Sequence, residues 1–300
     1  MHKNTDMNNL SLPELIIGTM RLGAWGSKMS SNELEIFING CIDLGLNAFD
    51  HADIYGDYTT ESDFGKVLKN NSSLRANVKL ITKCGINKVC DIRPEYKVPS
   101  YDCSAGHIKA SVEASLKNFN TDYIDLLLLH RPDYLMQPDE VAECFTKLKK
   151  DGKVCYFGVS NFSTSQFDLL NKSFQLTTNQ IEVSLFHLDA LDNGSLDQCM
   201  VHGIRPMAWS PLGGGSLFGT TLTEANKRIL KVADGLCDVY SCTIDQLLFA
   251  WLLSHPSGIL PVTGTSKLDR IVAAQKALSI KLAREDWYLL LQAAKGNQIP

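Results

Sequence analysis

The stretch NAFDHADIYG at residues 47–56 decides how the rest of the chain is organised. It begins as a short strand and then carries Asp50, His51, Asp53 and Tyr55 within six positions. A buried carboxylate without a partner costs several kcal/mol or takes up a proton. The stretch therefore predicts a strand whose end holds a paired charge.

Two later apolar runs also end in ionisable side chains. The run LITK ends at Lys83, and the run LLLLH ends at His130. Lys is almost never fully buried without a counter-charge, so we expect Lys83 to pair with Asp50. An acid, a phenol, an amine and an imidazole (Asp50, Tyr55, Lys83 and His130) thus lie at the ends of consecutive predicted strands.

Strand-like apolar runs alternate with helical patterns along the chain. The predicted strands are Ile16–Met20, Ala48–His51, Lys79–Cys84, Ile124–His130, Tyr156–Ser160, Thr178–Val183, Arg205–Trp209 and Ile259–Thr263. Strands that alternate with helices favour a parallel sheet, and about 250 residues is typical of a closed barrel of eight such units. We therefore predict an α/β fold, with one (β/α)8 TIM barrel domain over residues 1–300. Two extra helices are expected at Thr223–Cys237 and Arg284–Lys295.

Local signals mark the helix starts and one unusual loop. Capping boxes are predicted at Ser30–Glu33, Ser163–Gln166 and Thr243–Gln246. The segment Gly85–Cys103 is long for a strand-to-helix loop, and loops of this length are usually functional or disordered. It follows a strand on the side where barrel enzymes build their sites, so we expect a lid or a pocket wall.

The glycine pattern argues against a doubly wound dinucleotide-binding sheet. That fold needs Gly-x-Gly-x-x-Gly directly after the first strand. The chain has Gly18 and Gly23 there, and its glycine cluster at 213–215 follows a late strand instead. The barrel is the better interpretation.

Composition argues against several other classes. The net charge of the 300 residues is -4, without the basic excess of a nucleic-acid binder. No apolar run approaches the roughly 18 residues that span a bilayer, and the polar start does not resemble a signal peptide. The 9 Cys form no Cys-x-x-Cys pair and no zinc-like spacing with His. We expect a cytoplasmic protein with reduced thiols, no metal and no membrane or nucleic-acid partner.

The four ionisable side chains suggest proton transfer to a carbonyl oxygen. Tyr has an unperturbed pKa near 10, and a nearby ammonium is expected to lower the pKa of Tyr55. Asp50 would keep Lys83 charged and in place. Tyr55 could then act as a general acid, while His130 hydrogen-bonds the same oxygen and orients the substrate.

At these residues the chain resembles the aldo-keto reductase family over nearly its whole length. The segment from Asp50 to Gly56 is similar to the family's Asp-x-Ala-x-x-Tyr-Gly, with His51 where threonine is common. The segments that contain Lys83 and His130 match as well. The resemblance implies a catalytic tetrad of Asp50, Tyr55, Lys83 and His130, and a nicotinamide cofactor bound without a dinucleotide fold.

The same resemblance implies the cofactor side of the site. Ser160, Asn161 and Gln180 match residues that hold the nicotinamide carboxamide, and Trp209 matches the aromatic residue that stacks on the ring. The segment after that strand is expected to approach the pyrophosphate, where glycines remove obstruction. Its residues are Ser210, Pro211, Leu212 and Gly213.

The end of the last strand predicts a phosphate site. Ser266 and the residues after it suggest the capped start of a helix, whose free N–H groups and dipole favour anions. Lys267 and Arg270 add two cations. The resemblance assigns Arg270 to the 2′-phosphate of NADPH and places Gln275 near the adenine. The predicted phosphate-side set is Gly264, Thr265, Ser266, Lys267, Arg270 and Gln275.

We expect an NADPH-dependent oxidoreductase that reduces aldehydes or ketones to alcohols, as a monomer or weak homo-oligomer. One alternative is a regulatory subunit of the same fold that binds the cofactor. Another is a barrel lyase or isomerase with a phosphate substrate in place of the cofactor. Trp25 could line the substrate pocket or pack on the barrel rim, and the sequence leaves both open. It does not identify the substrate.

Overall fold

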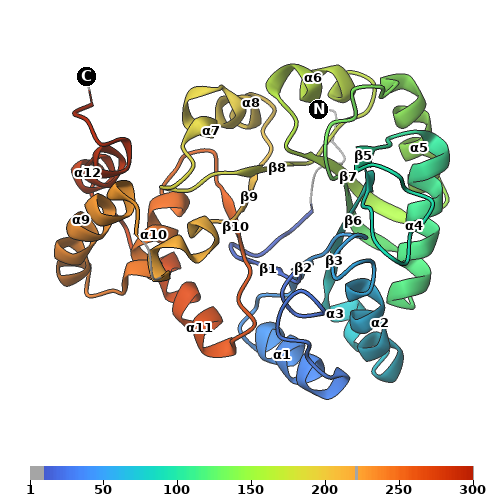
Figure 1. The fold of residues 1–300 in the computed structure, drawn as a ribbon, viewed down its shortest axis with the longest axis horizontal. Coiled ribbons are helices and arrows are strands. Elements are labelled where there is room, and N and C mark those ends of the chain that lie inside the picture. The colour runs from blue at the N-terminus through green and yellow to red at the C-terminus, as the bar shows by residue number, and fades with distance from the viewer. Residues whose placement is uncertain (1–9, 220–221, 300) are drawn as a thin grey trace, which may run out of the picture.

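Eight parallel strands close into a barrel in the computed structural model, which describes residues 10–219 and 222–299 (Figure 1). Around the barrel the strands follow the order β1-β10-β9-β8-β7-β6-β3-β2. Their bounds are β1 Ile16–Gly18, β2 Ala48–Asp50, β3 Lys79–Cys84, β6 Ile124–Leu129, β7 Val154–Ser160, β8 Asn179–Glu182, β9 Met207–Trp209 and β10 Leu260–Thr263. The predicted (β/α)8 barrel is confirmed.

The predicted strand ends differ from the observed ones by at most 2 residues. The first strand is the clearest correction, because it ends at Gly18 rather than at Met20. Leu22 N donates to Thr19 O at 2.9 Å, so the chain already turns at this point. Met20 is consequently exposed rather than part of a buried strand.

Helices surround the barrel on its outside (Figure 1). Those that follow the strands are α1 Ser31–Asp43, α2 Thr60–Asn70, α4 Ala105–Phe119, α5 Pro138–Lys150, α6 Thr164–Asn171, α8 Ser195–Val201, α10 Ile244–Leu253 and α11 Leu268–Lys276. Short helices are α3 Leu74–Asn77, α7 Asp189–Asp192, η1 Gly213–Phe218 and η2 Ala277–Ser279.

Both extra helices are present, as α9 Glu224–Tyr240 and α12 Arg284–Lys295. They lie side by side at one edge of the molecule (Figure 1), where Arg228 Nε donates to Ala293 O at 3.0 Å. Helix α9 runs past the predicted end at Cys237. It stops where Ser241 takes a left-handed conformation with φ 49°.

Local capping predictions hold for three helices and fail for α11. Both hydrogen bonds of the capping box are present at Ser30–Glu33 and at Ser163–Gln166, and Thr243 N donates to Gln246 Oε1 at 3.0 Å. Helix α11 was expected to be capped by Ser266, but Lys267 is its N-cap and makes no side-chain capping bond. A lysine side chain has no acceptor to offer the free N–H groups.

The long loop after β3 contains a small sheet of its own. Within it β4 (Ile86–Asn87) pairs antiparallel with β5 (Ser100–Tyr101). Asp102 N donates to Gly85 O at 3.0 Å, which joins the two ends of the loop. The segment is therefore an ordered projection beside the carboxyl ends of the strands.

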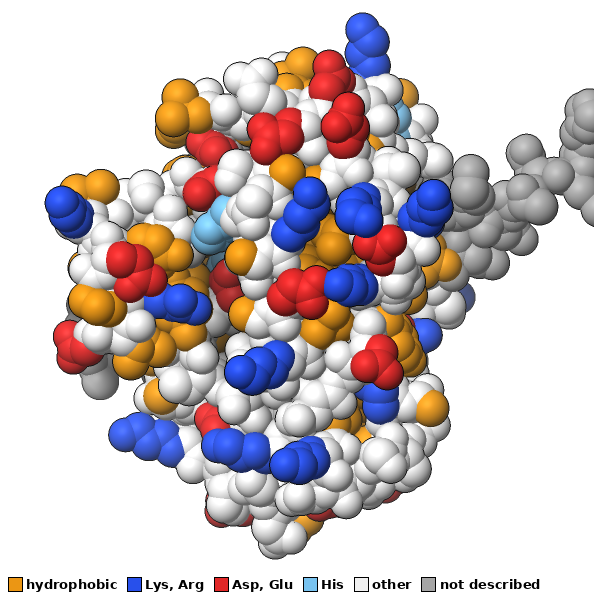
Figure 2. Space-filling view, turned by 90° about the vertical axis from the view of Figure 1, so that its right-hand side faces the viewer, with side chains coloured by type: hydrophobic (Ala, Val, Ile, Leu, Met, Phe, Trp, Pro, Cys, Tyr) orange, Lys and Arg blue, Asp and Glu red, His pale blue; other side chains and the backbone are white. Residues whose placement is uncertain are grey.

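The core consists of apolar side chains inside the barrel and between the strands and helices. On the surface, Lys and Arg side chains are mixed with Asp and Glu over one face (Figure 2), in line with the small net charge of -4. Among the described residues no single helix is long and apolar enough to cross a membrane. By length and composition, α9 and α10 pass that test only as a pair bent by 88°.

Candidate active site

The carboxyl ends of β2, β3 and β6 bring the predicted tetrad together. Lys83 Nζ donates to Asp50 Oδ2 at 2.8 Å, to His51 O at 2.7 Å and to Tyr55 Oη at 3.2 Å. An ammonium has three donors, so each has a partner. The rings of Tyr55 and His130 lie 6.0 Å apart between centroids, at 80° to each other. The expected pair of Lys83 and Asp50 is present, and both side chains are buried.

Asp50 has a second partner that the sequence did not indicate. Gln180, on β8, donates from Nε2 to Asp50 Oδ1 at 3.0 Å. Both carboxylate oxygens of Asp50 are thus hydrogen-bonded. The prediction assigned Gln180 to the nicotinamide carboxamide, but in this structure its amide nitrogen binds the carboxylate that holds Lys83.

The pKa of Tyr55 differs from the sequence-based expectation. Burial raises its pKa above the usual 10.0, and the opposing effect of Lys83 does not overcome that rise. The expectation of a lowered pKa is therefore wrong, because it considered the ammonium and not the loss of water. The result still suits a general acid, since Tyr55 keeps its proton at neutral pH. Lys83 donates to the phenol oxygen, so the phenol hydrogen is free for another acceptor.

His130 is neutral in this environment. Burial lowers its pKa well below 6.5, and the charges of Lys83 and Arg131 lower it further. Its Nδ1 atom is buried without a hydrogen-bond partner among the described residues. A neutral imidazole can donate a hydrogen bond from its N–H to a substrate oxygen, but it lacks the acidic second proton of an imidazolium. This favours Tyr55 over His130 as the acid.

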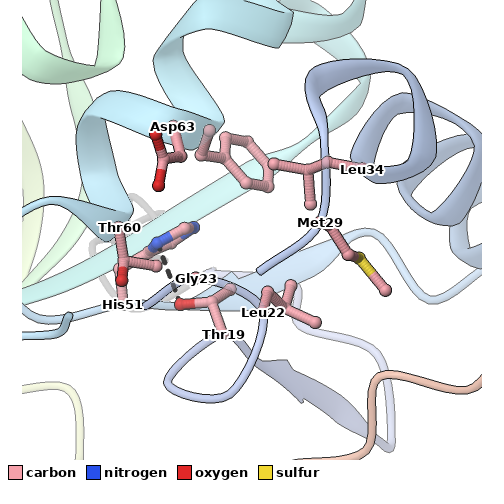
Figure 3. A pocket seen from close by; sticks show the side chains of 9 residues that line it. Thr19, Leu22, Gly23, Met29, Leu34, His51, Thr60 and Asp63 are labelled. Atoms are coloured by element: carbon pink, nitrogen blue, oxygen red, sulfur yellow. Dashed lines mark hydrogen bonds between the residues drawn. The ribbon is translucent and has the colours of Figure 1, made fainter. Parts of the chain in front are cut away.

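His51, the departure from the family's common threonine, is anchored away from the reacting groups. Its Nδ1 lies 2.9 Å from Thr19 Oγ1, and that hydroxyl donates to Asp50 O at 3.0 Å. Because the single hydroxyl hydrogen goes to Asp50 O, His51 Nδ1 must be the donor to Thr19. Figure 3 shows this contact at the edge of a small cavity of about 10 Å³, which Thr60 also lines. Burial lowers the pKa of His51 well below 6.5, so the ring is neutral.

Replacing Thr19 by Val is expected to destabilise the fold by about 1–3 kcal/mol, the cost of leaving a buried polar group unpaired. His51 Nδ1 would lose its partner, whereas Asp50 O would keep the backbone N–H of Thr19, which donates to it at 3.0 Å. Urea unfolding measures the change in the free energy of unfolding. Thr146→Val, on the exposed side of α5, is the control and should stay within about 0.5 kcal/mol of wild type. Equal losses in the two variants would contradict the role of Thr19.

The predicted nicotinamide-side residues form a connected group at the ends of β7 and β9. Ser160 Oγ donates to Gln180 O at 3.0 Å, and Asn161 Nδ2 donates to Ser160 Oγ at 2.8 Å. Trp209 Nε1 donates to Asn161 Oδ1 at 2.9 Å, which fixes the edge of the indole. The guanidinium of Arg131 lies 5.9 Å from the centroid of the Trp209 ring.

The segment after β9 makes a tight glycine turn. Gly213, Gly214 and Gly215 have φ values of 57°, 65° and 92°. Gly213 N donates to Ser210 O at 2.8 Å and Gly215 N to Leu212 O at 3.0 Å. A Cβ on Gly213 would approach the ring of Phe186 to 2.5 Å, whereas Gly214 and Gly215 have nothing within 4 Å of that position. Pro211, between Ser210 and Leu212, is buried.

Some of the predicted phosphate-side residues are exposed, and others make hydrogen bonds within the protein. Gly264, Lys267 and Arg270 are exposed. Thr265 Oγ1 accepts from Lys267 N at 3.2 Å, and Ser266 is half-buried beside it. Gln275 instead donates from Nε2 to Leu44 O at 2.6 Å and so ties α11 to the end of α1.

Sequence reasoning missed a buried carboxyl behind the tetrad. Glu61, on α2, accepts from Thr82 Oγ1 at 2.6 Å, from Ser115 Oγ at 2.9 Å and from Asn118 Nδ2 at 3.2 Å. Burial raises the pKa of Glu61, and these hydrogen bonds oppose the rise. The side chain links α2 to β3 and α4. Its partners are distant in sequence, so no local pattern pointed to it.

Comparisons with known proteins identify the family and the fold. A sequence model of the Aldo/keto reductase family matches residues 14–294. The chain is 45% identical to the uncharacterized oxidoreductase YcsN of Bacillus subtilis, over 97% of each chain. It is 41% identical to a 6-dehydroglucose reductase of Agrobacterium fabrum, also over 97% of each chain. A solved aldo/keto reductase from Klebsiella pneumoniae, in complex with NADP and acetate, is similar with a TM-score of 0.73 at 25% identity, over 93% of this chain and 90% of that chain.

Proposed function

Because this chain belongs to the aldo/keto reductase family, we propose that it reduces aldehydes or ketones to alcohols with NADPH. The observation that carries the proposal is the contact of Lys83 Nζ with both Asp50 Oδ2 and Tyr55 Oη. This contact couples a fixed ammonium to a phenol whose own hydrogen is free. A complete tetrad, in which hydrogen bonds join Lys83 to Asp50 and Tyr55, favours turnover over a purely regulatory, cofactor-binding role.

The tetrad residues have separate roles in this proposal. The phenol of Tyr55 donates its proton to the carbonyl oxygen as negative charge develops there. Lys83 stabilises the phenolate that remains, and Asp50 keeps the ammonium in place. Neutral His130 hydrogen-bonds the substrate oxygen and orients the carbonyl.

The cofactor-side residues fit a nicotinamide dinucleotide phosphate. Trp209 provides an aromatic surface beside Ser160 and Asn161. Gly214, Gly215 and Gly264 have no atom within 4 Å of a built Cβ, so the backbone there is open to close approach by a phosphate. The remaining contacts would come from the segments Ser210–Gly213 and Gly264–Gln275. When bound, the cofactor supplies a hydride to the carbonyl carbon.

Cofactor choice tests the phosphate side. Arg270 is exposed in the first turn of α11, where a guanidinium can grip a phosphate with two hydrogen bonds. Arg270→Ala is expected to weaken NADPH binding by about 1.5–3 kcal/mol, the range for hydrogen bonds to charged groups. NADH binding should barely change, because NADH lacks the 2′-phosphate.

Fluorescence titration with each cofactor measures both affinities. Arg284→Ala is the control, since Arg284 is also exposed and also begins a helix. Equal weakening of NADPH and NADH in the Arg270 variant would show that Arg270 does not read the 2′-phosphate.

The proposed activity is tested with a panel of carbonyl compounds and the loss of NADPH absorbance. The panel includes 6-dehydroglucose, because one relative is a 6-dehydroglucose reductase. We expect oxidation of NADPH that depends on both enzyme and carbonyl. A chain that binds NADPH tightly but reduces no carbonyl would support the regulatory alternative. Failure to bind NADPH at all would exclude both the proposed reductase and the regulatory alternative.

A further inference from the structure

Three loops meet at the rim of the barrel beside the proposed acid. Asp57, after β2, accepts from Trp25 Nε1 at 3.1 Å on Oδ2. Its other oxygen, Oδ1, accepts from Lys88 Nζ at 2.5 Å. Trp25 belongs to the loop after β1, and Lys88 follows β4 in the long loop after β3. A single carboxylate thus joins the loops after three strands that are neighbours in the barrel.

The hydrogen bond to Asp57 fixes the indole of Trp25 close to Tyr55 and Lys88. The centroids of the Trp25 and Tyr55 rings are 6.2 Å apart, with the planes tilted by 56°. Lys88 Nζ lies 5.3 Å from the Trp25 ring centroid. Trp25 is 36% exposed, so it stands at the surface directly beside Tyr55.

The backbone that presents Asp57 is strained. Gly56, Asp57 and Tyr58 have consecutive φ values of 60°, 54° and 64°. Non-glycine residues in this region persist only where surrounding contacts hold them, and such strain gathers at ligand clamps. Tyr58 supplies those contacts: its Oη donates to Ile86 O at 3.3 Å and accepts from Lys88 N at 3.1 Å.

The charge state of Asp57 suits a permanent contact. Hydrogen bonds from Lys88 and from Trp25 lower the pKa of Asp57 below 3.8. The carboxylate therefore remains ionised at neutral pH. An isolated surface ion pair contributes only about 0–1 kcal/mol. Here the same carboxylate also holds an indole, on a backbone that Tyr58 ties to the long loop after β3.

We propose that Asp57 and Lys88 are positioning residues that hold Trp25 as a wall beside the reacting carbonyl. This wall limits the size of the carbonyl substituent on the side of the β1 loop. The inference rests on the proposed function, since it names what controls substrate choice at that site. The residues involved belong to loops, which is where variation in barrel enzymes changes specificity.

Steady-state kinetics test the wall with propanal as the small aldehyde and benzaldehyde as the bulky one. Lys88→Met keeps the aliphatic stem and removes the ammonium. It is expected to raise the KM for propanal about two- to tenfold, the effect of losing one hydrogen bond. The ratio of kcat/KM for propanal to kcat/KM for benzaldehyde should fall by a similar factor, because Trp25 is no longer held in place. Values of kcat and the Kd of NADPH should stay within about twofold, as expected when only substrate binding is changed.

Lys147→Met is the matched control, because Lys147, on α5, forms an exposed ion pair at 3.1 Å with Asp151 just after that helix, outside the three loops. Its kinetics should equal those of wild type. A Lys88 variant with unchanged KM and preference, or one in which only kcat falls, would overturn the proposal.

A second readout does not depend on activity. The chain has 4 Trp, and each indole N–H is hydrogen-bonded, with Asp57, Asn161 and two backbone carbonyls as acceptors. In spectra of the protein with ¹⁵N-labelled tryptophan, Asp57→Gly should shift one indole signal upfield. Glycine tolerates the positive φ, so the carboxylate is removed without added strain. Trp25→Phe identifies the signal by its disappearance.

Asp57→Asn keeps an acceptor for the indole but loses the ion pair, so the Trp25 signal should stay near its wild-type position. A Trp25 signal that does not move in Asp57→Gly would overturn the proposal even in an active enzyme. If wild type reduces no carbonyl while the Trp25 signal moves as expected, the proposed function fails and the contact itself stands.

Discussion

Tyr55→Phe is expected to lower kcat for carbonyl reduction about 100- to 10,000-fold, the usual contribution of a general acid. The phenol is the strongest acid in the tetrad that keeps its proton at neutral pH and whose hydrogen has no partner among the described residues. His130 is held neutral by burial, and the three donors of Lys83 are all engaged. The ring of Phe occupies the same space, so the fold should survive. Steady-state kinetics with the best aldehyde from the panel measure the loss.

NADPH titration of the Tyr55→Phe variant separates chemistry from binding, and its Kd should match that of wild type. Tyr123→Phe is the control, because Tyr123 precedes β6 and so lies at the opposite end of the barrel. A Tyr55→Phe enzyme that works at the wild-type rate would show that another group donates the proton.

Lys83→Met is expected to lower activity about 100- to 1,000-fold, similar to removal of one preorganised donor from a site that stabilises developing charge. The side chains of Lys83 and Asp50 are 1% and 4% exposed, so the variant leaves a buried carboxylate without its counter-charge. Removal of one partner from a buried pair typically costs about 3–5 kcal/mol of stability. Urea unfolding and steady-state kinetics measure the two losses.

The direction of the pH effect follows from Tyr55. Reduction requires the protonated phenol, so its rate falls as pH rises through the pKa of Tyr55. Lys83 lowers that pKa against the effect of burial, so without Lys83 the fall should move to higher pH. An active Lys83→Met enzyme with an unchanged pH profile would argue against the coupling.

The double variant Asp50→Asn/Lys83→Met separates stability from catalysis. It removes both charges, so it should be more stable than Lys83→Met alone, since no uncompensated charge is left buried. It should not regain activity. If the double variant recovers activity along with stability, the loss in the single variant was a folding effect.

The stability contribution of Lys83 itself has a defined pH range. Burial disfavours its ammonium, but Asp50 and Tyr55 raise its pKa above 10.5 overall. A folded-state pKa that is raised stabilises the fold fully below the unfolded value, and this contribution is lost as pH rises through the folded one. The charge of Lys83 therefore supports the fold at neutral pH, and on the alkaline side this contribution is lost only above pH 10.5.

The strands, most helix starts and the positions of the tetrad could be predicted from the sequence because each depends on residues close together in the chain. Apolar runs mark β2, β3 and β6, and the ionisable residues at their ends had to meet once the strands formed a parallel barrel. The capping boxes at Ser30–Glu33 and Ser163–Gln166 are complete within four residues.

Only the tertiary structure decided which distant residues are in contact and how much water these contacts exclude. Gln180 reaches Asp50 across 130 residues of sequence, and the contacts of Asp57 with Trp25 and Lys88 depend on how three loops fold over one another. The pKa of Tyr55 rises rather than falls, because desolvation is a property of everything packed around the phenol. No local pattern records that burial, and so the sequence placed the acid without the direction of its pKa shift.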